Sequence, residues 1–95
     1  MLKWINKQTV ESDAGYVLAF TGQFSAEYRE GGRVLSLDID NGFDGSRYIV
    51  IVKGESLQHW GGRFGPAVSP SERARAAANI VEACDFQGLG ARVEE

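Results

Sequence analysis

The segment Arg33-Val34-Leu35-Ser36-Leu37-Asp38-Ile39-Asp40 decides the fold class of this chain. Its aliphatic side chains alternate with serine and aspartate, and this period of two places one set on each face of an extended strand. A strand with one apolar and one polar face is typical of an antiparallel sheet that is covered on one side only. We therefore predict that Ser36, Asp38 and Asp40 lie on an uncovered sheet face.

Further strands are predicted on both sides of this segment. The pair Gly31-Gly32 separates it from the run 24–29, which indicates a tight hairpin. The run 16–20 reads as another strand, and the β-branched run 48–52 is expected to be a buried central strand. Residues 2–12 predict only a weak strand or an irregular arm.

Turns and a helix complete the predicted fold. Asn41-Gly42 and Asp44-Gly45 indicate a compact turn segment. Ser69-Pro70-Ser71-Glu72 combines an N-cap serine, proline at the first helical position and glutamate at the third, which is a capping box. Gly88 is a plausible residue just beyond the helix end. The apolar stripe of the helix is predicted to be Arg73, Ala76, Ala77, Ile80, Val81 and Cys84.

The composition excludes several classes of protein. The 95 residues are enough for one domain, and one cysteine with one histidine cannot form an internal disulfide or supply the roughly four ligands of a zinc site. Ten basic and thirteen acidic residues give a net charge of −3, which is unfavourable for a phosphate-backbone binder. Long apolar runs and a secretory-signal pattern are both missing from the sequence. We expect a cytoplasmic protein that binds neither nucleic acid nor membrane.

Patterns for catalysis and metal binding are weak. His59 is the single histidine, and a general base needs a partner that a sequence cannot reveal. Cys84 lies on the apolar stripe of the helix, where cysteine behaves as a small hydrophobic residue. Residues 38–45 fail the calcium-loop pattern from Asp38 and from Asp40, and Gly61–Gly65 lacks a phosphate-loop ending. We therefore expect no catalytic residue, no metal site and no cofactor.

An acidic patch is the first candidate for a partner-binding surface. Asp38 and Asp40 share the polar face of the strand, and Asp44 is nearby in the sequence. The alternative is a hairpin loop in which the Asp and Asn side chains satisfy local backbone amides.

The glycine-rich loop is the second candidate. Trp60, Arg63 and Phe64 belong to residue types that are enriched at the centres of protein interfaces. The alternative for Trp60 is a buried core residue. The glycines 61, 62 and 65 are the ones that turn chemistry alone does not account for.

The chain from about Tyr28 onward resembles one of the small immunity-protein families of bacterial polymorphic toxin systems. The resemblance is carried by Gly31-Gly32-Arg33-Val34-Leu35, Ser56-Leu57-Gln58-His59-Trp60, Ser69-Pro70-Ser71-Glu72-Arg73, Ile80, Phe86-Gln87-Gly88 and Ala91-Arg92-Val93-Glu94. In the family a proline usually follows soon after the tryptophan, whereas here Gly61-Gly62 follows and proline is delayed to position 66. The resemblance implies a protein without catalytic residues that neutralises a cognate toxin by binding it, and it assigns no functional residue.

Together these features predict a single α+β domain over residues 1–95. We expect a four- or five-stranded, mainly antiparallel sheet, one C-terminal helix from about Pro70 to Phe86 on one face, and a short terminal edge strand over 91–94. The leading function is an immunity protein that binds its toxin stoichiometrically, and an acidic face would favour a basic toxin such as a nuclease. The alternative is a sheet protein that binds a small ligand or a second copy, and the third hypothesis is an enzyme using His59. The oligomeric state stays open.

Overall fold

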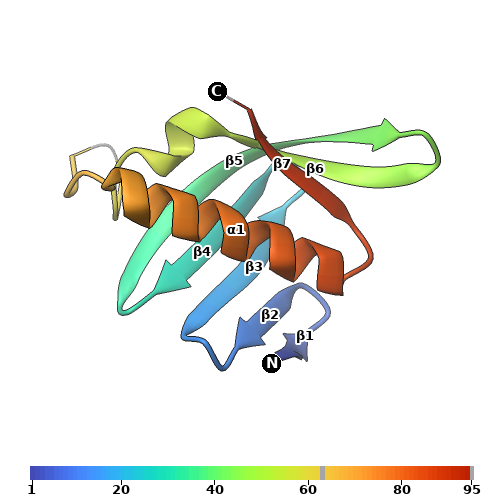
Figure 1. The fold of residues 1–95 in the computed structure, drawn as a ribbon, viewed down its shortest axis with the longest axis horizontal. Coiled ribbons are helices and arrows are strands. Elements are labelled where there is room, and N and C mark those ends of the chain that lie inside the picture. The colour runs from blue at the N-terminus through green and yellow to red at the C-terminus, as the bar shows by residue number, and fades with distance from the viewer. Residues whose placement is uncertain (63, 95) are drawn as a thin grey trace.

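The computed structural model describes residues 1–62 and 64–94 (Figure 1). Within these residues the strands form one sheet whose spatial order follows the sequence, and one long helix lies across one face of it. The strands are β1 (Leu2–Asn6), β2 (Thr9–Ser12), β3 (Tyr16–Gly22), β4 (Ser25–Glu30), β5 (Arg33–Asp44), β6 (Arg47–Lys53) and β7 (Gly90–Glu94). The helices are the 3-10 turn η1 (Gly54–Leu57) and the α-helix α1 (Pro70–Phe86).

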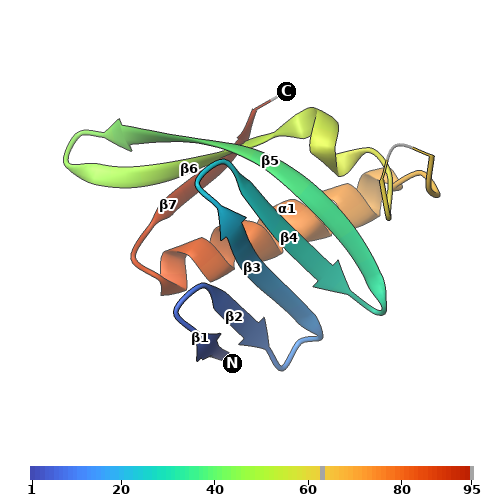
Figure 2. The ribbon, with the colours of Figure 1, turned by 180° about the vertical axis from the view of Figure 1, so that it is seen from behind.

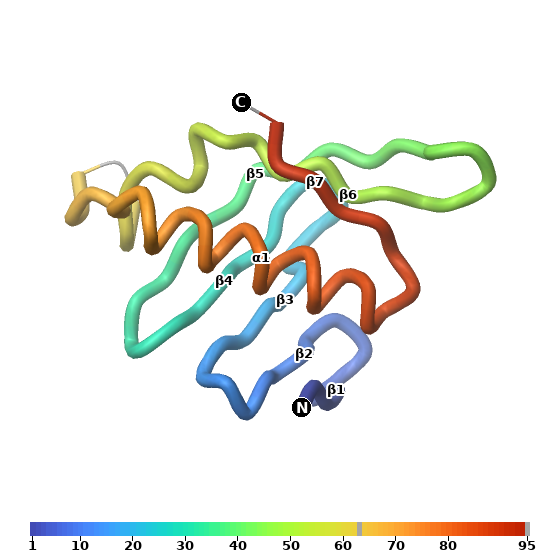
Figure 3. The backbone as a smooth tube through the Cα atoms, viewed as in Figure 1, coloured from blue at the N-terminus to red at the C-terminus, as the bar shows by residue number. Residues whose placement is uncertain are grey.

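The predicted α+β fold with a mainly antiparallel sheet is confirmed. Each neighbouring pair of these strands is antiparallel except β6 and β7, which run parallel, and β7 is the C-terminal edge strand. The sheet has seven strands among the described residues, more than the four or five predicted. The parallel pairing is possible because η1 and α1 carry the chain back across the sheet between β6 and β7 (Figure 3).

Part of the extra sheet comes from the N-terminal segment, which was expected to be a weak strand or an irregular arm. It folds as the hairpin β1–β2, in which Trp4 lies opposite Val10. In β2 the burial alternates, with Val10 and Ser12 buried, but β1 is exposed at every residue after Leu2. A strand without a buried face shows no alternation of apolar and polar residues in its sequence. Its extended conformation is determined by pairing with the neighbouring strand, which the sequence pattern does not reveal.

The predicted turn at Asn41-Gly42 is wrong. Strand β5 continues through these residues to Asp44, with Asn41 opposite Val50, and the chain reverses at Gly45. The strand changes partner along its length, because residues 33–38 pair with β4 and residues 39–44 pair with β6. The far half of the β5–β6 hairpin therefore projects beyond the helix (Figure 2).

Helix α1 begins and ends where the sequence predicts. Ser69 Oγ accepts a hydrogen bond from the Glu72 amide at 3.2 Å, and Glu72 Oε1 accepts one from the Ser69 amide at 2.9 Å. The buried residues of the helix are Ala76, Ile80, Ala83 and Cys84. The predicted stripe is therefore correct for Ala76, Ile80 and Cys84, but Val81 is 40% exposed and Ala83 is buried in its place.

A network of charged and polar groups fastens the first half of α1 to the β4–β5 hairpin. The Arg75 Nε donates to Glu30 Oε1 at 3.0 Å, and an Arg33 nitrogen lies 2.7 Å from a Glu72 oxygen. The buried Tyr28 hydroxyl donates to Glu30 at 2.6 Å. The Arg75 guanidinium lowers the pKa of Glu30, and the Ser69 amide and then Arg33 lower the pKa of Glu72 to about 2. These contacts hold the first half of α1 against the β4–β5 hairpin.

The opposite face of the sheet carries no helix (Figure 2). Ser36, Asp38 and Asp40 are all exposed on it, while the alternate residues Leu35, Leu37 and Ile39 are buried beneath α1. The prediction that one face of the sheet is exposed to solvent and the other is covered by the helix is confirmed. Among the described residues, no helix is long and apolar enough to cross a membrane.

Candidate functional site

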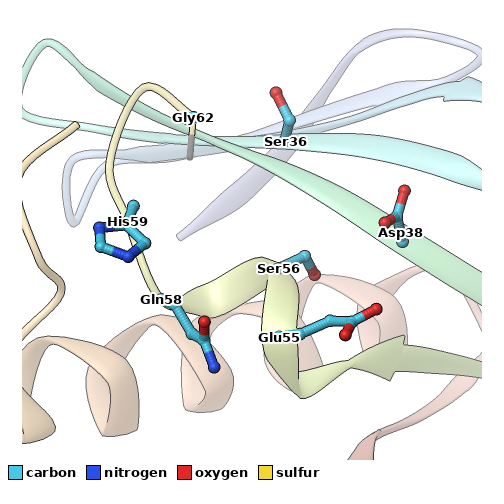
Figure 4. A pocket seen from close by; sticks show the side chains of 7 residues that line it. All are labelled: Ser36, Asp38, Glu55, Ser56, Gln58, His59 and Gly62. Carbon is cyan, nitrogen blue, oxygen red and sulfur yellow. The ribbon is translucent and has the colours of Figure 1, made fainter. Parts of the chain in front are cut away.

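A hollow of about 520 Å³ opens beside the first half of β5, on the side that β6 leaves free. After β6 the chain turns into η1 and runs back along this free edge. Figure 4 shows Glu55 and Ser56 of η1 on one side of the hollow, the part of β5 that carries Ser36 and Asp38 on the other, and His59 at the end nearer the glycine-rich loop. Its main lining side chains come from two elements and the segment that follows them: Ser36, Asp38, Glu55, Ser56, Gln58 and His59.

The segment that follows η1 is held by backbone hydrogen bonds. The Val68 amide donates to the Gln58 carbonyl at 2.9 Å, and the Trp60 amide donates to the Pro66 carbonyl at 2.8 Å. The Gly61 amide donates to the Val34 carbonyl on β5 at 2.7 Å. The base of the glycine-rich loop is therefore fixed to the sheet edge that borders the hollow.

Glycine is required within this loop for two different reasons. Gly61 and Gly62 have φ of 75° and 120°, which side chains other than glycine rarely adopt. At Gly65 a Cβ would lie 1.6 Å from the Trp60 carbonyl oxygen, so the backbones approach too closely for any side chain. The loop glycines that turn chemistry alone did not account for thus have structural roles.

Trp60 is a core residue and offers no contact surface, which corrects its place among the candidate partner-binding residues. Its side chain is 2% exposed, with the Arg33 guanidinium carbon 4.2 Å from the ring centroid. Its indole nitrogen has no hydrogen-bond partner in the described part of the chain, although it lies near enough to Glu72 to help lower the pKa of that carboxyl. Trp60 therefore anchors the loop in the core, which agrees with the alternative interpretation of the sequence that Trp60 is a buried core residue.

The other loop candidates have different positions. The Phe64 side chain is 95% exposed, within the tight turn in which the Gly65 amide donates to the Gly62 carbonyl at 3.0 Å. Arg63 lies outside the described residues. The loop thus presents one aromatic ring to solvent, two residues after Gly62, which lines the hollow.

The acidic candidates do not form one patch. Asp38 lines the hollow, and Asp40 lies on the same face but pairs with Lys53 at 3.5 Å. Asp44 is at the tip of the projecting hairpin, opposite Arg47, and lines a different hollow of about 460 Å³ against α1 and β7.

Uncompensated negative charge is concentrated in the first hollow. Within residues 1–62 and 64–94, three carboxylates have neither an ion pair nor a hydrogen bond, and two of them line it: Asp38, Glu55 and, elsewhere, Asp44. The neighbouring acids of the same face are paired, Glu27 with Arg29 at 3.0 Å and Glu11 with Lys3 at 3.8 Å.

His59 lines the hollow, but its ring is oriented by the backbone. Its Nδ1 lies 3.1 Å from the Gly65 carbonyl oxygen, which can only accept, so in the neutral imidazole Nδ1 carries the proton and Nε2 is left as an acceptor. In the described part of the chain, no ion pair or hydrogen bond joins His59 to a carboxylate. Cys84 is buried, which raises its thiol pKa to about 11, and residues 1–62 and 64–94 contain no group of three or more ligands suited to a metal.

Sequence reasoning missed Glu55, Ser56 and Gln58 as site residues. They lie about twenty residues after Asp38 in the chain and reach it only because β5 exchanges β4 for β6 in mid-strand. A strand that changes partner looks like any other alternating strand in the sequence. The usable signal in the sequence is the mainly polar segment Glu55-Ser56-Leu57-Gln58, which follows the buried strand 48–52 directly after Gly54.

A comparison of the chain with protein-family models, with curated proteins and with solved structures found no match.

Proposed function

We propose that this chain is a cytoplasmic immunity protein that neutralises a cognate protein toxin by stoichiometric binding rather than by catalysis. One observation supports this most: a hollow beside a sheet face without a helix cover is lined by two carboxylates, Asp38 and Glu55, that have no partner among the described residues, and the loop that follows Gly62 carries an exposed aromatic ring. Charge and a rigid aromatic contact are what a protein-binding surface needs. The resemblance to immunity proteins supplies the kind of partner.

The electrostatics of the surface favour a basic toxin. The chain has a net charge of −3, and the hollow beside β5 is lined by two carboxylates that no cation of residues 1–62 and 64–94 pairs with. Such a surface accelerates the encounter with a positively charged partner, and the effect decreases as salt screens it. A nuclease, which needs a basic surface to bind nucleic acid, is a toxin of this kind.

Co-expression tests this function. The protein encoded next to this chain is expressed in a host cell, with and without the chain, and growth is measured. We expect growth arrest by the neighbouring protein alone and rescue by the chain, with a one-to-one complex in light scattering. If the neighbouring protein is harmless, or if it remains toxic and forms no complex with the chain, the proposed function is wrong.

A small-ligand protein is the second candidate, because a hollow of about 520 Å³ is within the usual range for such sites. Thermal-shift screening against a metabolite collection separates the two functions. A ligand that raises the unfolding midpoint in proportion to its concentration favours this alternative.

A further inference from the structure

We infer that the hollow beside β5 receives an arginine side chain of the partner protein, with Phe64 packing against the partner surface around it. This inference rests on the proposed function and adds to it the chemistry of the contact. The occupant is a guanidinium-bearing segment of a basic protein, and the hollow is the place where that segment is held (Figure 4).

The lining of the hollow is rich in hydrogen-bond acceptors. Asp38 and Glu55 are carboxylates that accept only, Ser36 and Ser56 have hydroxyl oxygens, and His59 presents Nε2 as an acceptor because Nδ1 donates to the Gly65 carbonyl. A guanidinium has five N–H donors in a planar fork and no acceptor. Donor-rich arginine, which has no acceptor of its own, therefore complements these acceptors.

The backbone of β5 supplies a further acceptor. The Gly61 amide donates to the Val34 carbonyl, so Val34 turns its backbone away from β4. Backbone direction alternates along an antiparallel strand, and the β4–β5 register is unbroken over residues 33–38. The Ser36 carbonyl therefore also points away from β4, on the side of the hollow that Ser36 lines.

The described side chains give the hollow a negative charge. Asp38 and Glu55 have no cation of their own in the described part of the chain, whereas Asp40 is already paired with Lys53. Asp44, the third unpaired acid, faces Arg47 across the hairpin end and lies in the other hollow. A cation that enters the hollow beside β5 thus meets two carboxylates that have no ion pair with any described residue.

The loop contributes the apolar part of the contact. Gly62 lines the hollow, and Phe64 lies two residues further on in a turn closed by the Gly62 carbonyl. An aromatic ring beside a buried charge pair excludes water from it, which strengthens the pair. Because the loop base is hydrogen-bonded to β5, the backbone on which the loop stands is already ordered before binding.

An NMR titration tests the hollow without a toxin. Labelled protein is titrated with N-acetyl-arginine amide, and N-acetyl-citrulline amide serves as the uncharged probe of the same shape. We expect saturable shifts at the backbone amides of Ser36, Asp38, Glu55 and Ser56 with the arginine probe, and a response at least tenfold weaker with citrulline. Asp38→Asn with Glu55→Gln should abolish saturation, while Asp44→Asn should bind the probe like the wild type.

The inference is overturned by an equal response to both probes, by shifts that spread evenly over all exposed acids including Asp44, or by no saturable shift at all. Its failure is distinguishable from that of the proposed function. If the protein neutralises a toxin but its hollow does not bind the arginine probe, the inference about the hollow is wrong and the proposed function stands. If the hollow binds arginine selectively but the protein neutralises no toxin, the inference about the hollow stands and the proposed function is wrong.

Discussion

Replacing Trp60 by alanine tests the assignment of this residue to the core. The side chain is 2% exposed, lies 6.5 Å from Tyr28 between ring centroids and carries the Arg33 guanidinium on its face. Truncation of a buried tryptophan to alanine costs about 3–5 kcal/mol, and the lost cation–π contact adds about 0.5–1 kcal/mol. A domain of this length has a total stability of roughly 5–14 kcal/mol, so one substitution removes a large share of it.

The measurement is urea unfolding of Trp60→Ala, followed by circular dichroism, beside thermal unfolding. We expect a fall in the thermal midpoint of at least about 12 °C. Trp4→Ala is the matched control, because this second tryptophan is 48% exposed and its main contact is the Phe86 ring at 5.9 Å. Its loss should be about 1 kcal/mol, the value of one aromatic pair. Equal losses in both variants would refute the core assignment.

Three further predictions concern the loop, the helix cap and the buried thiol. Gly65→Ala should lower the free energy of unfolding in urea by about 1–3 kcal/mol, because the new Cβ would overlap the Trp60 carbonyl. Gly42→Ala is the control: its Cβ meets only contacts of 3.7 Å or more, so it should change the free energy of unfolding by less than about 0.5 kcal/mol. Glu72 has a pKa of about 2 in the folded protein against an ordinary 4.5, so the stability that its ionised carboxylate contributes is complete above pH 4.5 and is lost as the pH falls toward 2. Over this pH range the thermal midpoint of Glu72→Gln should fall less steeply than that of the wild type. Identical slopes would contradict the stabilising role of the Glu72 carboxylate. Burial holds the Cys84 thiol pKa at about 11, so a disulfide reagent at pH 8 should label it only as fast as the protein opens, and rapid labelling of the native protein would contradict its burial.

Local signals made the helix and the central sheet predictable. The capping box at Ser69 and Glu72 satisfies backbone amides at the start of the helix with side chains that lie within four residues in the sequence. In β5, the alternation of Leu35 and Leu37 with serine and aspartate is itself the reason that one face of the strand is buried. These features depend on neighbours in the sequence. For the same reason the bounds of α1 and the wet face of the sheet were predicted correctly.

Features that depend on distant pairing were not predictable. Strand β1 has no buried face of its own, and Asn41-Gly42 is a turn motif that becomes a strand because β6 pairs with it. The site follows the same rule. Asp38 could be identified as an exposed acid, but its approach to Glu55 results from the change of partner in β5, and the separation of Asp44 from them results from the length of the projecting hairpin.

The most direct test of the central claim is growth rescue by charge-reversed variants against the product of the neighbouring gene, which the proposed function expects to be the toxin. Asp38→Lys with Glu55→Lys should abolish rescue while the variant remains folded by circular dichroism, because both substitutions place positive charge where the basic partner must enter. Asp44→Lys should rescue growth like the wild type, since this residue lies in the other hollow. Full rescue by the double variant, or loss of rescue in Asp44→Lys alone, would contradict the assignment of partner binding to the hollow beside β5.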